Sequence, residues 1–444
     1  MKLKIYIKYL LIVCLLAPGA LFAQDTRSAA ATDSLTLEQV VNYALENTAA
    51  MEQALIDERI GEREIRASLA GWFPQINANF GGTYNIRRQQ QPIGGEIITF
   101  GQKYNSSVAL QATQSIFDNN LFLASKASRS RKLLLDQQVT DTRINTVVEV
   151  SKAFYNVLLT QEQLRILDQN ISRQEKQFND ARSRYEVGLV DKTDYQRASI
   201  TLANIRSDRK RVQESIKANV AYLKQLMGFP VEQDLNLTYN YGRMEQEVQV
   251  DTTELITFDR RIELQQLQTQ RDLLKLNTAY NRWSFLPTVS AFANYNLLYF
   301  NNEIANLYSQ HFPNSAVGIQ ASLPIFQGTR RLQNLKIAEL QEDRLDVQIE
   351  DARRAINTEY QTALANYKGD YTEWRTVQQN LVVAEEVYEI IKLQYDEGVK
   401  AYVDLIVAET ELRTTQLNYY NALYSVLSSK LDLQRALGNI DINR

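Results

Sequence analysis

The sequence predicts a mainly α-helical chain with a membrane β-barrel portion, built as two copies of one plan. Three observations favour this fold class. A turn motif occurs twice, two very long segments without proline keep a helical apolar seam, and four shorter segments alternate apolar with polar residues. Each copy then supplies one long coiled-coil helical hairpin and two of the four β-strands expected per chain.

The repeated motif has the residues of a turn between two helices. Segment 184–194 and segment 394–404 share Tyr, Gly and Asp at one constant shift along the chain. Glycine suits the position just past a helix end, because it adopts the left-handed conformation without a Cβ clash, and a following Thr or Asp can cap the returning helix. An ordinary helix–turn–helix glycine explains either copy alone. Two copies in matching contexts indicate an internal repeat.

The first 23 residues have the layout of a secretory signal peptide. Three lysines precede an apolar run from Tyr9 to Ala17, and Ala23 provides the small residue expected before a cleavage site. We therefore expect export and removal of residues 1–23. The formal charge of the whole chain is −3, and the loss of three lysines leaves the mature chain more acidic. Such a charge gives no reason to expect nucleic-acid binding.

The residues that build most catalytic and metal sites are scarce. The chain has one cysteine, Cys14, within the expected signal peptide, and one histidine, His311, in a polar loop. A metal cluster or a histidine-based catalytic set needs more such residues, and phosphate-binding and nucleophile motifs are absent. The sequence therefore predicts no enzyme activity and no cofactor.

The remaining sequence divides into a first repeat (24–230), an equatorial linker (231–256) with a possible strand at 235–241, and a second repeat (257–444). In each repeat we expect a helix, a β-hairpin, a long helix and a return helix. The helices before the strands are expected at 35–70 and 257–285, the β-hairpins at 75–117 and 287–326, the long helices at 118–187 and 327–397, and the return helices at 189–228 and 399–438.

The apolar seams of the long helices are narrow, at alternating spacings of four and three residues, which predicts coiled-coil packing between neighbours rather than a broad globular core. The first seam comprises Val150, Phe154, Val157, Leu164, Ile171, Phe178 and Tyr185, and the second Tyr360, Leu364, Tyr367, Tyr371, Trp374, Leu381, Tyr388 and Tyr395.

The four strands each present one apolar and one polar face, in the pattern of outer-membrane β-strands. A sheet in lipid must close, because an open edge leaves backbone groups without hydrogen bonds, and four strands cannot close alone. Two soluble hairpins with one buried face are the alternative. For the barrel we expect Val108, Leu110, Ile319 and Leu323 to face lipid, and Ser107, Gln111, Gln320 and Ser322 to face the lumen.

These motifs together resemble the outer membrane efflux protein family, the TolC-like channels, along nearly all of the expected mature chain. The resemblance rests on the paired Tyr-x-x-Gly-x-x-x-x-x-Asp turns, the Phe-Pro and Leu-Pro entries to the strands, the Ile-Phe exits and the Leu-Gly or Met-Gly ends of the return helices. It implies a homotrimer in the outer membrane of a Gram-negative bacterium, with a twelve-stranded β-barrel and a tunnel of helices in the periplasm. No further domain is needed for that architecture.

Two functions from different classes fit this pattern. The first is the outer membrane channel of a tripartite efflux or type I secretion system, a passive exit duct that docks on a periplasmic adaptor and an inner-membrane pump, as the resemblance implies. The second is a periplasmic coiled-coil adaptor or scaffold protein without a channel. The alternating strands favour the channel. The cargo, whether a small molecule or a polypeptide, does not follow from the sequence.

The two repeated turns are the expected contact sites for the adaptor, because they are the helix ends furthest from the strands. Their residues are Gly188, Leu189, Val190, Gly398, Val399 and Lys400. A turn that only reverses the chain is the alternative reading.

The resemblance also implies a periplasmic gate where the inner helices converge, formed by Asp194, Tyr395, Lys400 and Asp404. The chain departs from the family pattern one helical turn after Asp404, where Val407 replaces a further aspartate, which puts a second acidic ring in doubt. Capping of the return helices by Asp194 and Asp404 is the alternative.

Overall fold

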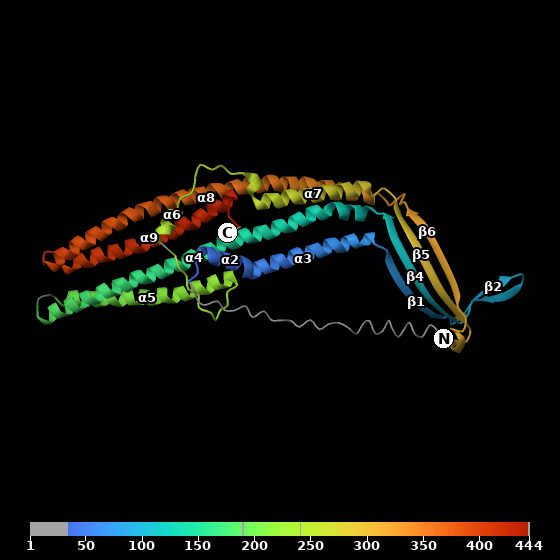
Figure 1. Cartoon of the computed structure of the whole chain (residues 1–444), viewed down its shortest axis with the longest axis horizontal. Helices are drawn as coiled ribbons and strands as arrows, with labels where there is room; N and C mark the ends of the chain where they lie inside the picture. Colours follow the sequence, from blue (N-terminus) through green and yellow to red (C-terminus); the bar gives the residue numbers. More distant parts are fainter. Residues whose placement is uncertain (1–33, 189–190, 240, 443–444) are drawn as a thin grey trace.

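The computed structural model describes residues 34–188, 191–239 and 241–442, so the expected signal peptide lies outside the described part. The molecule is elongated, with β-strands at one end and the turns of two helical hairpins at the other (Figure 1). In the described part of the chain, no helix is both long and apolar enough to cross a membrane.

Two long helical hairpins form the end opposite the strands. Helix α4 (Asn119–Glu186) returns as α5 (Lys192–Met227), and α8 (Arg330–Asp396) returns as α9 (Tyr402–Leu437). We name α4–α5 the outer hairpin and α8–α9 the inner hairpin. Gly369, the one glycine inside α8, does not interrupt the helix. The sequence therefore predicted both long helices to within a few residues.

The strand-side half of the wall contains shorter helices. They are α2 (Leu37–Asn47) and α3 (Ala49–Leu69), which pack on α4, and α7 (Ile262–Trp283), which packs on α4 and α8. Short 3-10 turns occur at Ala70–Trp72, Phe258–Arg260 and Ile304–Asn306.

The expectation of one helix over 35–70 is wrong, because Thr48 is extended and separates α2 from α3. The end of α5 packs at this break: a Cβ on Gly228 would lie 2.2 Å from the carbonyl oxygen of Asn47. The polypeptide that arrives from α5 thus occupies the place where α2 and α3 separate.

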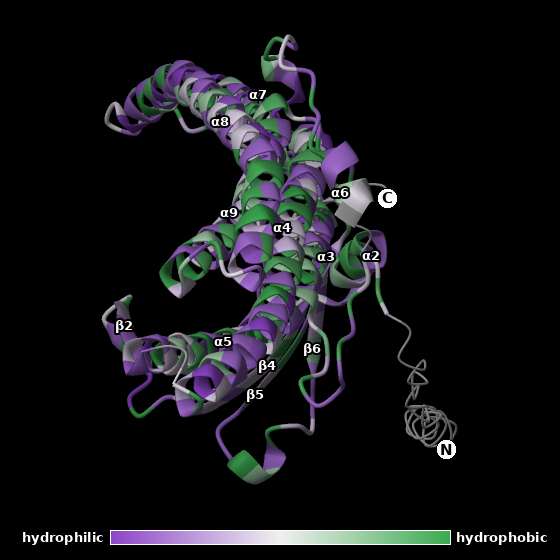
Figure 2. Cartoon of the chain, turned by 90° about the vertical axis from the view of Figure 1, so that its left-hand side faces the viewer, coloured by the Kyte–Doolittle hydropathy of each residue, from purple (hydrophilic) through white to green (hydrophobic). Residues whose placement is uncertain are grey.

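Seen from the hairpin end, the helices form a curved wall with α7 and α8 along one arm and α5 along the other (Figure 2). The largest buried cluster is near the middle of the wall and includes Phe154, Tyr367 and Val426, from α4, α8 and α9. A second cluster near the turns joins all four hairpin helices, with Ala181, Ala198, Tyr388 and Leu405 among its members. Most of the predicted seam residues are buried or half-buried in these clusters.

The strands form one antiparallel sheet in the order β1-β4-β5-β6. Their bounds are Gln75–Tyr84, Tyr104–Phe117, Thr288–Asn301 and Phe312–Ser322. The register brings the apolar positions onto one face, since Val108 pairs with both Phe80 and Leu297. Three of the four residues expected to face lipid (Val108, Leu110 and Ile319) share this face, and the four residues expected to face the lumen share the other.

Two expectations about the strands are wrong. The fourth strand ends at Ser322, so Leu323 lies outside it, just before Pro324, whose nitrogen has no hydrogen to donate. The connection within the expected hairpin 75–117 contains a second hairpin, β2 (Gln89–Ile93) and β3 (Glu96–Phe100), turned by Gly94 and Gly95 in the left-handed conformation. This hairpin leans toward the open side of the curved wall (Figure 2).

The linker differs as well. In place of a strand over 235–241, the only pairing is an isolated bridge between Leu35 and Leu237 within the described residues. Helix α6 (Tyr241–Glu247) follows, and its Met244 is buried in the central cluster, together with Val248 just beyond it. Burial of these two side chains against the hairpin helices accompanies a helix that begins only where the expected strand was to end.

Candidate functional site

The turn of the outer hairpin begins at Gly188, which ends α4. Its φ is +77°, and its N–H donates to the carbonyl oxygen of Tyr185 at 2.9 Å. The return helix starts at Lys192, with Asp191 as its N-cap: the Asp191 carboxylate accepts from the N–H of Thr193 at 2.9 Å. Capping therefore falls to Asp191, and Asp194 is in the first turn of α5. The expected tip residues Leu189 and Val190 lie outside the described residues.

The turn of the inner hairpin is built in the same way. Gly398 has φ +76° and donates to Tyr395 O at 3.0 Å, and the N–H groups of Val399 and Lys400 both reach the carbonyl oxygen of Gln394, at 2.8 and 3.2 Å. These bonds satisfy carbonyl groups at the end of α8. Val399 is 74% exposed and Lys400 is also exposed, so the turn presents an apolar and a basic side chain to its surroundings.

Tyr395 lies in the second apolar cluster, between the two hairpins. Its ring is 5.8 Å from the ring of Tyr402 on α9, and the Arg184 guanidinium of α4 is 5.2 Å from its centroid. Burial raises the pKa of the Tyr395 hydroxyl, and the charge of Arg184 opposes this shift. The aromatic ring thus links the inner hairpin to the outer one. Arg184, which sequence analysis did not single out, provides the cation.

The two aspartates and the lysine expected at the gate are placed close to the turns but do not pair. Asp194 and Asp404 are half-buried in the first turns of α5 and α9, and Lys400 is exposed before α9. Among the described residues none of the three takes part in an ion pair within the chain. Burial raises the pKa values of the Tyr395 and Tyr402 hydroxyls, and the charge of Asp194 adds to this shift.

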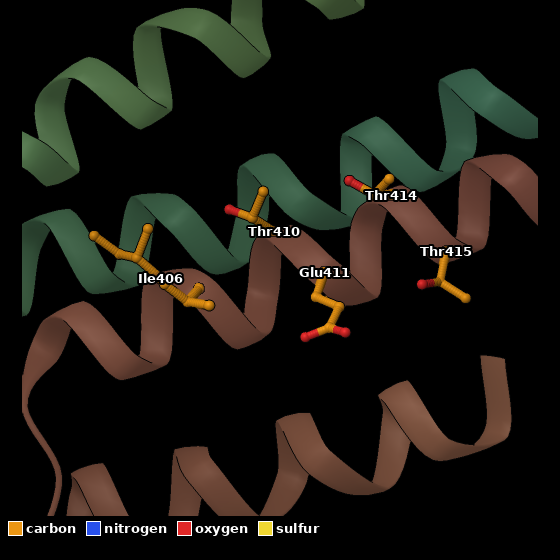
Figure 3. A pocket seen from close by; sticks show the side chains of 6 residues that line it. Ile406, Thr410, Glu411, Thr414 and Thr415 are labelled. Atoms are coloured by element: carbon orange, nitrogen blue, oxygen red, sulfur yellow. The ribbon is translucent and has the colours of Figure 1, made fainter. Parts of the chain in front are cut away.

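A shallow groove of about 400 Å³ follows α9 beyond the gate residues. It is lined by Ile406, Val407, Thr410, Glu411, Thr414 and Thr415. All six belong to α9, and in the view the side chains of Thr410 and Thr414 are drawn above those of Glu411 and Thr415 (Figure 3). Val407, at the position of the absent second aspartate, is 61% exposed. The surface beyond Asp404 is therefore apolar and hydroxyl-lined, with one carboxylate.

A buried polar cluster between the hairpins was missed by sequence analysis. Glu409 of α9 is 4% exposed, and Gln174 of α4 is 1% exposed. The Gln174 side-chain amide donates to the Glu409 carboxylate, and the Arg173 Nε is 3.5 Å from it. The available signal was the presence of polar residues at positions where a regular coiled coil has apolar ones. Spacing alone cannot tell which partner such residues meet.

The model of the family "Outer membrane efflux protein" matches residues 40–229 and 257–439, which include both hairpins and all four strands of the sheet. The chain belongs to the outer membrane efflux protein family. Its two matched segments correspond to the two copies of the internal repeat.

Individual relatives are distant but extend over nearly the whole chain. The outer membrane protein TolC of Vibrio cholerae is 20% identical over 409 residues, with 91% of each chain covered. The protease secretion protein PrtF of Dickeya chrysanthemi is 20% identical over 419 residues, 93% of this chain and 90% of its own. Among solved structures, the outer membrane protein VceC from Vibrio cholerae superposes with a TM-score of 0.72 at 17% identity, covering 90% of this chain and 96% of VceC.

Members of the outer membrane efflux protein family are transport channels, and this chain has the fold of those channels. It is an outer membrane protein of a Gram-negative bacterium whose helices extend into the periplasm. The reading as a periplasmic scaffold without a channel is not favoured, because the match includes the strands as well as the helices.

Proposed function

We propose that three copies of the chain form the outer membrane channel of a tripartite efflux or type I secretion system. The carrying observation is the sheet: it is four-stranded, one of its faces is apolar, and β1 and β6 are its edge strands. In lipid each edge must find a partner. Neighbouring copies provide that partner at both edges, and three sheets of four strands close a barrel of twelve.

The helices continue this barrel as a duct. Each chain contributes a curved wall of helices in line with its sheet (Figures 1 and 2). In the proposed trimer, three such walls enclose a tunnel. The exposed apolar side chains on α8, such as Leu340, Val347 and Val383, are available for contact with the next copy. The duct is passive, because the chain carries no nucleotide-binding motif that could supply energy.

Mass measurement and conductance test this proposal together. The purified protein in detergent is expected to have the mass of a trimer, to migrate as a trimer in SDS until it is heated, and to form stepwise conducting channels in planar bilayers. A monomer that remains soluble without detergent and does not conduct would contradict the proposal.

The partners follow from the position of the two turns. We infer that the turn residues Gly188, Leu189, Val190, Gly398, Val399 and Lys400 dock on a periplasmic adaptor, which connects the duct to an inner-membrane pump. These turns are furthest from the sheet, and Val187 and Val399 expose apolar side chains there. One relative is named for protease secretion, so polypeptides belong with small molecules among the candidate cargos.

The gate is the narrow end of this duct. We infer that Asp194, Tyr395, Lys400 and Asp404 control the periplasmic opening. Three Asp404 carboxylates around one axis raise one another's pKa values and attract cations, and Lys400 at the turn can offset part of that charge.

A further inference from the structure

The outer and inner hairpins are connected by polar contacts at regular intervals along α4 and α9. The Lys152 ammonium is 2.6 Å from the Asp432 carboxylate, and the Gln163 amide donates to Asn421 at 3.0 Å. The third contact is the one between Gln174 and Glu409. As the residue number rises on α4 it falls on α9, so the helices are antiparallel, and the contacts recur about three helical turns apart.

The third contact differs from the others in burial. The side chains of Lys152 and Asp432 are 28% and 46% exposed, whereas the side chain of Glu409 is 5% exposed. This contact is also nearest to the turns, about 18 Å from the end of α4 at 1.5 Å per residue. Buried charges cost far more than exposed ones when their partners are incomplete. The free energy of docking between the hairpins near the turns therefore depends strongly on Glu409.

The partners of Glu409 are few. Among the described residues Arg173 is the one cation in contact, at 3.5 Å. It also donates to the Asn170 amide oxygen at 2.5 Å and lies 5.7 Å from the centroid of the Tyr388 ring. Glu409 Oε1 and Gln174 Oε1 are buried without a hydrogen bond among the described residues. The ionised carboxylate is thus only partly compensated.

The titratable and charged groups coupled to Glu409 come from three helices. Arg173 on α4 acts on the Glu409 carboxyl, and the charge of Glu409 acts in turn on Tyr388 of α8 and Tyr402 of α9. Burial raises the pKa of the Glu409 carboxyl, and Gln177, Arg173 and Gln174 oppose this without cancelling it. Both tyrosines remain neutral at physiological pH, because burial raises their pKa values, that of Tyr388 to about 12. Glu409 is therefore the carboxyl of this cluster, and its ionised form is the one that burial disfavours.

We propose that Glu409, held by Arg173 and Gln174, is a proton-sensitive latch that fixes the inner hairpin on the outer hairpin near the turns. The latch rests on the proposed function, because it would regulate how readily the periplasmic end of the duct opens. A protonated Glu409 loses its desolvation cost and stays docked. An ionised Glu409 is more stable when the hairpins separate and water reaches it.

The direction of the pH dependence follows from linkage. A carboxyl whose pKa in the docked state is above its value in water makes docking most stable at low pH, and this stability is lost as the pH rises through the raised pKa. The periplasmic end is therefore expected to open more readily at pH 8 than at pH 5. Glu409→Gln, a neutral side chain of the same shape, should keep the hairpins docked at both pH values.

The distance between the two turns measures the latch directly. Glu186 and Glu397 are exposed at the ends of α4 and α8, and Glu186→Cys with Glu397→Cys provides one spin label on each hairpin. In this labelled variant Cys14 is also replaced by serine, so that the labels attach only at positions 186 and 397. We expect the label separation, measured by pulsed electron spin resonance in lipid nanodiscs, to lengthen and broaden between pH 5 and pH 8, and to stay short at both pH values in Glu409→Gln.

Two further variants make the test specific. Arg173→Gln removes the only cation in contact and should lengthen the separation at pH 8 beyond that of the parent, with recovery at pH 5. Glu411→Gln, at an exposed carboxylate two residues along the same helix, should behave like the parent. A parent separation that ignores pH, or a Glu409→Gln separation that shifts as the parent does, would overturn the latch.

These experiments distinguish failure of the latch proposal from failure of the proposed function. Label separation is a property of one chain and is read whether or not the protein conducts, while conductance in planar bilayers tests the channel. A conducting parent whose separation ignores pH overturns the latch alone. A parent that neither forms trimers nor conducts overturns the proposed function.

Discussion

At the scale of single residues, glycines with positive φ show how local geometry and packing combine. Gly188 and Gly228 both end helices, with φ values of +77° and +69°. No atom lies within 4 Å of a Cβ built on Gly188, whereas one built on Gly228 would lie 2.2 Å from Asn47 O. The first glycine is required by the turn alone, and the second by the turn and by the close approach of α2.

A matched pair of substitutions separates these two requirements. Gly188→Ala should lower the stability of the protein by about 1 to 2 kcal/mol, the cost of placing a Cβ in the left-handed conformation. Gly228→Ala should cost clearly more, because the methyl group must displace backbone of α2. The measurement is the midpoint of thermal unfolding followed by circular dichroism. Equal decreases of the unfolding midpoint in the two variants would show that the α2 backbone moves aside without a loss of stability.

The gate residues give a second prediction at this scale. Asp404→Ala and Lys400→Ala should change single-channel conductance and its block by multivalent cations, because each alters the charge at the narrow end of the duct. Trimer stability in SDS should stay the same, since neither side chain has an ion pair within the described chain. If both variants conduct and block like the parent, other residues set the gate, with Val407 the next candidate.

At the scale of elements, the sheet differs from the helices in how it is stabilised. Strands β1, β4, β5 and β6 are hydrogen-bonded to one another in that order within the chain. The apolar face of the sheet is nevertheless exposed, with Phe80 77% and Ile319 73% accessible. A sheet with such a face in water would expose a large apolar patch. In the barrel proposed above, lipid covers this face and the opposite face lines the lumen.

Neighbouring positions on β6 test this assignment. Ile319→Arg should destabilise the folded protein in lipid by about 2 to 4 kcal/mol near the membrane midplane, because the charge enters hydrocarbon. Gln320→Arg, one residue further and on the other face, should cost much less. Refolding into liposomes under increasing urea measures both. Equal costs would contradict the barrel orientation.

At the scale of the whole molecule, the long axis separates two kinds of surface: the sheet at one end and the two turns at the other (Figure 1). Only the turns can meet a periplasmic partner end-on. The apolar clusters that hold the hairpins together stop short of them, so Gly188 and Gly398 are exposed and have no neighbour within 4 Å of a Cβ. Substitutions at these glycines are therefore expected to affect the proposed docking on the adaptor more than the packing of the apolar clusters.

Bulky substitutions at the two turns test adaptor docking. Gly188→Phe with Gly398→Phe should abolish capture of the adaptor in a pull-down and abolish export, while trimers still assemble. Substitution of Gly369 by Ala, at an exposed position in the middle of α8, is the control and should leave both unchanged. Adaptor capture at the parental level in the double variant would count against the turns as the docking site.

The sequence by itself determined the repeated plan, the two hairpins and the two-faced strands, because these depend on short-range periodicity and on glycine and proline at helix ends. Thr193, Asp194 and the turn glycines could be recognised as parts of the repeated turn motif for the same reason. Asp191, the residue that caps α5, lies only two positions from an expected capping residue. Local rules located these helix ends to within a few residues, but they missed the cap of α5 although its partner Thr193 is only two residues away.

Only the tertiary structure decided the features whose partners are distant in sequence. The break at Thr48 is set by the end of α5, and the fold of the linker is set by the burial of Met244 in the central cluster. The polar contacts of Glu409 are with Arg173 and Gln174, which lie on the other hairpin. A helical seam tells which face of a helix is buried, but the partner across that face depends on the register between helices, and packing of the whole chain fixes that register.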